Sequence, residues 1–164
     1  MKQVVVQGLG FVGLAMSIAI ASSNDQKGSP LYNVIGLDLP SKEGHKKVNS
    51  INNGELPLKS SDKALEAEFY KCIKQKNLSA STDPKIISNA DYVIVDINLD
   101  VNLQEKKGCI NFEGFSNAIS TVGEYISEDT LVIIETTVPP GTTEKIAYPI
   151  LFEKLQKRFP NIKE

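Results

Sequence analysis

The sequence predicts a doubly wound α/β domain, with a mostly parallel sheet and helices on both of its faces. Short apolar runs alternate along the chain with longer segments of helical periodicity, which is the pattern of repeated β-α-β units. The runs at 91–97 and 130–134 are continuously apolar, as in strands buried on both faces of a parallel sheet. We expect residues 1–164 to form one domain with its own core.

The individual elements follow from these runs and from the residues that bound them. We expect strands at 2–7, 33–38, 78–81, 91–97 and 130–134. We expect helices at 11–22, 41–52, 61–76, 84–89, 112–126 and 142–157. Either Thr82 or Asp83 is expected to cap the short helix that begins at Pro84. The polar segment 22–30 is predicted to be a lengthened surface loop, and the charged segment 104–108 to be a turn.

The first predicted strand leads directly into a glycine motif, with Gly8, Gly10 and Gly13 in a G-x-G-x-x-G pattern. In this motif Gly8 allows a tight turn, Gly10 lets the backbone approach a pyrophosphate, and Gly13 lets the helix pack against the strand. Phe11 and Val12 complete the turn, where free N–H groups at the helix start face the phosphates. The pattern predicts a dinucleotide site of the Rossmann type.

An acidic residue, Asp38, stands at the carboxyl end of the second predicted strand. A carboxylate there accepts hydrogen bonds from the adenosine ribose and repels the 2′-phosphate of NADP, so we expect the cofactor to be NAD. The interval from Gly13 to Asp38 exceeds the usual spacing of about 20 residues, and the loop at 22–30 accounts for the excess. The alternative is a glycine turn in an ordinary α/β protein, with Asp38 as a solvated strand end.

Composition argues against several other classes of protein. A formal net charge of −2 gives no electrostatic basis for binding nucleic acid or an anionic membrane. No apolar stretch reaches the ~18 residues of a membrane span, and residues 1–22 do not have the pattern of a signal peptide. Two cysteines make neither a disulfide framework nor a metal site. We therefore expect a cytoplasmic protein without a bound metal.

Four segments together resemble a known family. They are GLGFVGLAMS at 8–17, GLDLPSK at 36–42, INNGELPL at 51–58 and ETTVPPGTTEKI at 135–146. Their order and approximate spacing are similar to those in the N-terminal NAD-binding domain of the UDP-glucose/GDP-mannose dehydrogenases, over nearly the whole chain. The fourth segment is the most specific, because a strand followed by Thr-Val-Pro-Pro-Gly-Thr and a helix is not a general feature of Rossmann domains.

The resemblance implies a reaction and a larger enzyme. Members of this family oxidise the C6 alcohol of a nucleotide sugar, such as UDP-glucose or a UDP-N-acetylhexosamine, to a uronic acid with two NAD, in polysaccharide biosynthesis. The family's catalytic cysteine, lysine and asparagine lie beyond the N-terminal domain. On the resemblance, the chain is therefore expected to be one part of a longer, homodimeric enzyme and to be inactive alone.

The resemblance also implies roles for four further residues. Thr137 matches a threonine beside the nicotinamide and the water used in hydrolysis, so it is the candidate catalytic residue. Glu135 lines the same site or caps the sheet edge, and Lys42 contacts the adenosine side or is simply an exposed lysine. The family usually has a Val-Pro-Thr-Pro-like turn after the fourth strand, whose threonine contacts NAD. The segment 96–100 departs from that pattern, and Asn98 is the candidate to supply the contact instead. Thr137 has an alternative role as a turn residue that bonds its own backbone.

The remaining residues with reactive side chains have simpler interpretations. Cys72 shares a helix face with apolar neighbours and is expected in the core, whereas Cys109 follows Gly108 in a predicted loop. His45 belongs to a lysine-rich helix start and is expected on the surface. Two other functions remain open from the residues alone. They are an NAD oxidoreductase of the 6-phosphogluconate or hydroxyacyl type, and a module that binds a dinucleotide without catalysis.

Overall fold

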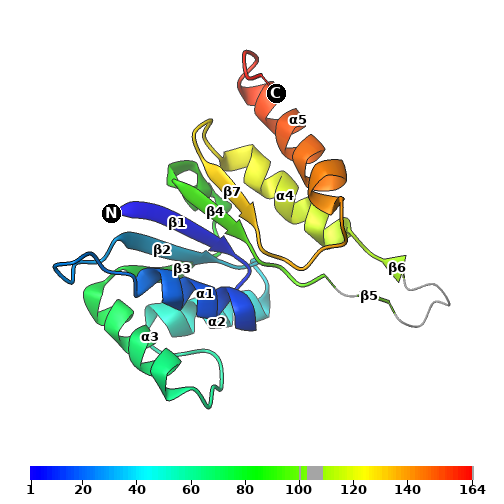
Figure 1. Ribbon diagram of the computed structural model, residues 1–164. Coiled ribbons are helices and arrows are strands. Elements are labelled where there is room, and N and C mark those ends of the chain that lie inside the picture. The colour runs from blue at the N-terminus through cyan, green and yellow to red at the C-terminus, as the bar shows by residue number, and fades with distance from the viewer. Residues whose placement is uncertain (100, 103–108, 164) are drawn as a thin grey trace.

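The computed structural model describes residues 1–99, 101–102 and 109–163, and its centre is a parallel sheet of five strands (Figure 1). The strands are β1 (Lys2–Gln7), β2 (Tyr32–Leu37), β3 (Leu78–Ser81), β4 (Tyr92–Val95) and β7 (Leu131–Ile134). Their order across the sheet is β3-β2-β1-β4-β7, so β2 and β3 extend the sheet on one side of β1, and β4 and β7 extend it on the other. This confirms the predicted doubly wound α/β fold, and it makes the carboxyl end of β1 the topological switch point where such sheets bind ligands.

Helices cover both faces of the sheet (Figure 1). One face carries α1 (Phe11–Ala21), α2 (Lys42–Asn52) and α3 (Lys63–Gln75). The other carries the 3₁₀ helix η1 (Pro84–Asn89), α4 (Glu113–Tyr125), the π-helical turn η2 (Thr143–Ala147) and α5 (Tyr148–Arg158). The side chains of β1 point alternately to the two faces of the sheet and enter the hydrophobic core on each. Val4 and Val6 pack on the first face, and Val5 packs on the second.

Hydrogen bonds from side chains set several of the helix starts. Ser41 accepts from the backbone N–H of Gly44, and Asp62 accepts from those of Ala64 and Leu65. At η1 the cap is Asp83 rather than Thr82, because the Asp83 carboxylate accepts from the backbone N–H two residues later. These caps explain why the helices begin within two residues of the expected positions.

A short antiparallel pair follows β4 and was not predicted. It consists of β5 (Val101–Asn102) and β6 (Cys109–Ile110). Two-residue strands are too short to leave a periodic pattern in the sequence. The structure thus corrects the expected loop position of Cys109 to a strand, while the turn expected at 104–108 lies outside the described residues. Within the part of the chain that is described, no helix is long and apolar enough to cross a membrane.

Candidate functional site

The glycine turn between β1 and α1 is packed so closely that two of its glycines admit no side chain. Gly8 has a φ of +104°, and a Cβ atom there would lie 2.0 Å from the backbone oxygen of Asp96. A Cβ atom on Gly13 would lie 1.9 Å from the backbone oxygen of Gly8. Contacts this short are impossible for real atoms, so Gly8 and Gly13 are required by the backbone conformation and by helix packing.

Gly10 differs from the other two, because a Cβ atom there would meet nothing within 4 Å among the described residues. The residue lies at the N-cap of α1, and no described side chain caps that helix end. Phe11 and Val12, the next two residues, are exposed. The first N–H groups of α1 therefore stand beside open space, and this is the arrangement that binds a pyrophosphate at a helix N-terminus.

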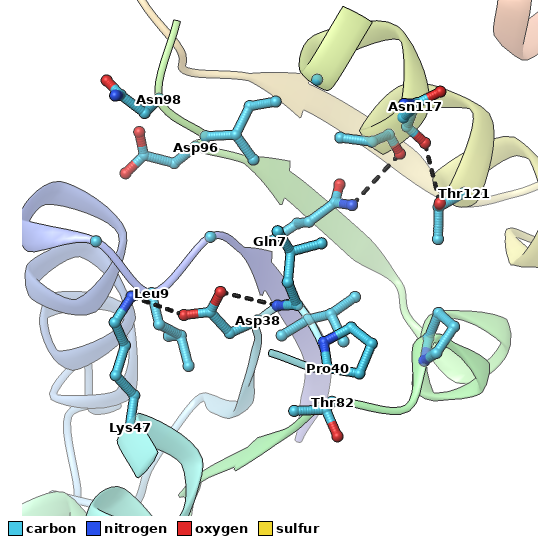
Figure 2. Close-up of a pocket in the computed structure, with 18 residues that line it drawn as sticks. Gln7, Leu9, Asp38, Pro40, Lys47, Thr82, Asp96, Asn98, Asn117 and Thr121 are labelled. Carbon is cyan, nitrogen blue, oxygen red and sulfur yellow. Dashed lines mark hydrogen bonds and ion pairs between the residues drawn. The ribbon is translucent and has the colours of Figure 1, made fainter. Parts of the chain in front are cut away.

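Asp38 lies directly after β2 and beside the turn, with a partly buried carboxylate that two hydrogen bonds orient (Figure 2). Its Oδ1 accepts a hydrogen bond of 2.8 Å from the backbone N–H of Leu39. Its Oδ2 accepts one of 2.9 Å from Lys47 Nζ in α2, and only 13% of the Asp38 side chain is exposed. These contacts hold the carboxylate at the edge of the cleft, as an acceptor for ribose hydroxyls requires.

A cleft of about 590 Å³ opens over the glycine turn (Figure 2). Its walls come from the turn, from the segments after β2, β3 and β4, and from one side of α4. The segments supply Pro40 and Thr82, and α4 supplies Asn117 and Thr121. The cleft therefore crosses the carboxyl ends of the strands at the point where their order reverses, and its volume is within the ~300–1,000 Å³ of ligand sites.

Two further polar side chains line the cleft beside the turn. Gln7, the last residue of β1, donates from Nε2 to the backbone oxygen of Ala118 in α4 at 3.3 Å. Asp96 follows β4, and its buried Oδ2 has no hydrogen-bond partner in the described part of the chain. Burial raises the pKa of the Asp96 carboxyl above its ordinary range, since the charged form loses solvation. Asn98 lines the cleft near Asp96.

This geometry fits a dinucleotide. The free space at Gly10 admits the pyrophosphate against the start of α1, and Asp38 is placed for the ribose on the β2 side. The carboxylate of Asp38 also disfavours a phosphate at the 2′ position of that ribose. The residues present thus fit NAD.

Comparison with known proteins places this site in a family. Residues 2–163 match the model of the UDP-glucose/GDP-mannose dehydrogenase family, NAD binding domain. The chain belongs to this family. The match favours this family over NAD oxidoreductases of the 6-phosphogluconate and hydroxyacyl types. The cofactor of the family is NAD.

Relatives with assigned activities agree with the family match. A UDP-N-acetyl-D-mannosamine dehydrogenase of Methanococcus vannielii is 30% identical over 94% of this chain and 32% of its own length. A UDP-glucose 6-dehydrogenase of Campylobacter jejuni is 28% identical over 88% of this chain and 33% of its own. The crystal structure of an NDP-N-acetyl-D-galactosaminuronic acid dehydrogenase from Methanosarcina mazei superposes with a TM-score of 0.83 at 30% identity, over 94% of this chain and 31% of the other. The chain therefore spans about a third of the length of these relatives.

Three residues that the family resemblance singled out do not line the cleft. Lys42 is exposed at the first position of α2, and Lys47, one and a half turns later, contacts Asp38 instead. Thr137 is exposed and Glu135 half-buried in the segment after β7. That segment is tied to the end of β4 by Thr136, whose Oγ1 accepts from the backbone N–H of Ile97 at 3.0 Å.

Several residues that line the cleft were not predicted as site residues, and two of them, Lys47 and Asp96, carry ionisable groups. Lys47 stands among several lysines of similar spacing, and only the position of α2 shows which one reaches Asp38. Asp96 was included in a predicted strand at 91–97, but β4 ends at Val95. A polar residue near the carboxyl end of a buried strand is the signal that identifies it.

Two reactive side chains outside the cleft, those of Cys72 and His45, lie where the sequence predicted them. Cys72 is fully buried against α1, and burial raises the pKa of its thiol. The Cys72 sulfur is therefore neutral and shielded, and the prediction that it belongs to the core is confirmed. His45 is exposed on α2, as expected.

Proposed function

We propose that this chain is the cofactor-binding part of an enzyme that oxidises the C6 hydroxyl of a UDP-sugar to a uronic acid. The observation that supports this most is the match to the family over residues 2–163, together with a cleft whose residues fit its cofactor. The relatives with assigned activities use UDP-N-acetyl-D-mannosamine and UDP-glucose, so we propose the same class of substrate here.

Different residues of the chain bind different parts of the cofactor. The start of α1 at Gly10 binds the pyrophosphate, and Asp38, oriented by Lys47, binds the adenosine ribose. NAD, when bound, supplies the acceptor for the electrons of the alcohol. Thr137 and Glu135 follow β7 at the same edge of the sheet, where we propose that they border the nicotinamide end. Lys42 remains proposed as a secondary contact on the adenosine side.

We propose that the sugar site and the nucleophilic thiol come from a further segment of the enzyme. The oxidation to an acid requires an activated thiolate to hold the aldehyde. Cys72 does not serve, because it is fully buried and its pKa is raised. The chain spans about a third of the relatives' length, which leaves room in the complete enzyme for such a segment. We also propose that the complete enzyme is a homodimer in the cytoplasm.

The test is NADH absorbance with UDP-glucose and UDP-N-acetylhexosamines in parallel. The 164-residue chain is compared with the same chain continued by its downstream coding region. We expect no turnover by the 164 residues alone and steady NADH formation by the longer protein with one of these sugars. Thr137→Ala in the longer protein is expected to slow the hydrolytic step. Steady NADH formation by the short chain would show that the active site is complete within it. The proposal that the sugar site and the thiol come from a further segment would then be wrong.

A further inference from the structure

Two carboxylates flank the glycine turn at the same level of the sheet, one on each side of β1. Gln7, the last residue of β1, is in register with Leu37 of β2 and with Val95 of β4. Asp38 follows Leu37, and Asp96 follows Val95. An acidic residue therefore stands just beyond the carboxyl end of each of the two strands that flank β1.

Backbone hydrogen bonds hold both acids close to the turn. The N–H of Gly8 donates to the carbonyl oxygen of Leu37 at 2.8 Å, and the N–H of Asp96 donates to that of Gln7 at 2.8 Å. On the β4 side, the side chain of Asp96 also lies close to the turn, because a Cβ atom placed on Gly13 would be 3.1 Å from Asp96 Oδ2. The Asp96 carboxylate thus lies against the first turn of α1.

The two acids differ in what they contact within the chain. Asp38 has a cation at 2.9 Å and a backbone N–H at 2.8 Å. Asp96 Oδ2 is buried without a hydrogen-bond partner in the described ranges, although the residue lines the cleft. A buried carboxylate oxygen is costly unless a donor satisfies it, so this arrangement favours a ligand that brings hydroxyl donors. Figure 2 shows Asp96 and Asn98 together, on the side of the turn away from Pro40 and Thr82.

A dinucleotide carries one ribose on each side of its pyrophosphate. With the pyrophosphate at Gly10 and the adenosine ribose at Asp38, the second ribose extends toward the end of β4, where Asp96 lies. We propose that Asp96 binds the ribose of the nicotinamide half by accepting hydrogen bonds from its hydroxyl groups. The site then holds each ribose with one carboxylate. This inference rests on the proposed binding of NAD in the cleft.

Three ligands separate the two riboses in a calorimetric titration of the 164-residue chain. ADP has only the adenosine ribose, ADP-ribose adds the second ribose, and NAD⁺ adds the nicotinamide. We expect Asp96→Ala to weaken NAD⁺ and ADP-ribose about tenfold or more, the scale of lost hydrogen bonds to a charged acceptor, and to leave ADP unchanged. Asp38→Ala is expected to weaken all three ligands. Asp129→Ala, which removes an exposed acid after α4, is the charge-matched control and is expected to change none.

The outcomes distinguish this inference from the function on which it rests. If the unmodified chain binds neither ADP nor NAD⁺, the proposed function fails as well. If it binds both and Asp96→Ala leaves NAD⁺ unchanged, or weakens ADP equally, the inference is overturned while the function stands. Circular dichroism verifies the fold of each variant. Should Asp96→Ala unfold, Asp96→Asn keeps the size of the side chain and is expected to weaken NAD⁺ and ADP-ribose, again without an effect on ADP.

Discussion

Asp38 and Lys47 form an ion pair inside the cleft, with 2.9 Å between Oδ2 and Nζ. The lysine is partly shielded, with 31% of its side chain exposed, and it comes from the helix that follows the strand carrying the acid. The pair places a carboxylate and an ammonium group side by side where the ribose 2′ position is expected. We expect the carboxylate to disfavour a 2′-phosphate, and the ion pair occupies the ammonium group that could otherwise bind one.

The first prediction concerns the choice of cofactor. The chain is expected to bind NAD⁺ in preference to NADP⁺, and Asp38→Ala is expected to weaken NAD⁺ binding by about 1–3 kcal/mol, because hydrogen bonds to a charged acceptor are lost. Titration calorimetry with both cofactors measures this. Equal or tighter binding of NADP⁺ by the unmodified chain would contradict the assigned role of Asp38.

The second prediction follows from the ion pair. Removing the carboxylate leaves Lys47 without its partner, and a free ammonium group at this position attracts a phosphate. Asp38→Ala is therefore expected to raise the affinity for NADP⁺ by about 1 kcal/mol or more. The double variant Asp38→Ala/Lys47→Ala is the control and should lose that gain. A gain that persists in the double variant would mean that another group binds the phosphate.

The third prediction compares two glycines of the turn. Gly10→Val is expected to abolish NAD⁺ binding in a folded chain, because its side chain would enter the open space where we propose that the pyrophosphate binds. Gly13→Ala, a smaller change, is expected to prevent native packing, since its Cβ would lie 1.9 Å from the Gly8 carbonyl oxygen. Circular dichroism and calorimetry on both variants check this. Retained NAD⁺ affinity in a folded Gly10→Val chain would show that the turn is structural only.

The fourth prediction concerns a buried amide that joins three elements. The Nδ2 of Asn77 donates to the carbonyl oxygens of Ala21 at 2.7 Å and Tyr32 at 3.1 Å, and the residue is fully buried. Asn77→Leu is expected to lower the free energy of unfolding by about 1–3 kcal/mol, because a buried and a partly buried carbonyl group lose their donor. Urea denaturation measures the loss. Asn161→Leu, at an exposed position, is the control, and equal losses in the two variants would refute this role.

The fifth prediction uses the buried acid of the cleft. Burial raises the pKa of Asp96 in the folded chain above the unfolded value of about 3.9. Between these two values the folded chain binds more protons than the unfolded chain, so this residue's contribution to stability falls as the pH rises. Asp96→Asn removes this titration. Without cofactor, the free energy of unfolding of the variant minus that of the unmodified chain should therefore increase from acid to neutral pH. A difference that does not change with pH, measured in urea, would rule out this effect.

The sequence predicted the sheet because strands buried on both faces leave continuous apolar runs, and it predicted the glycine turn because only glycine fits there. Lys47 was not predicted, since which lysine of α2 reaches Asp38 depends on where Ser41 starts the helix. Asp96 was not predicted because an apolar run does not show at which residue pairing with β1 ends. Contacts between elements, unlike the elements themselves, are set by tertiary packing.

A crystal structure of the chain grown with NAD⁺ would show whether the cleft over the glycine turn binds this cofactor. We expect the pyrophosphate against the first N–H groups of α1 beside Gly10, and the adenosine ribose hydroxyls within hydrogen-bond distance of Asp38. A dinucleotide bound elsewhere on the molecule, or bound in the cleft with its adenosine ribose away from Asp38, would contradict it.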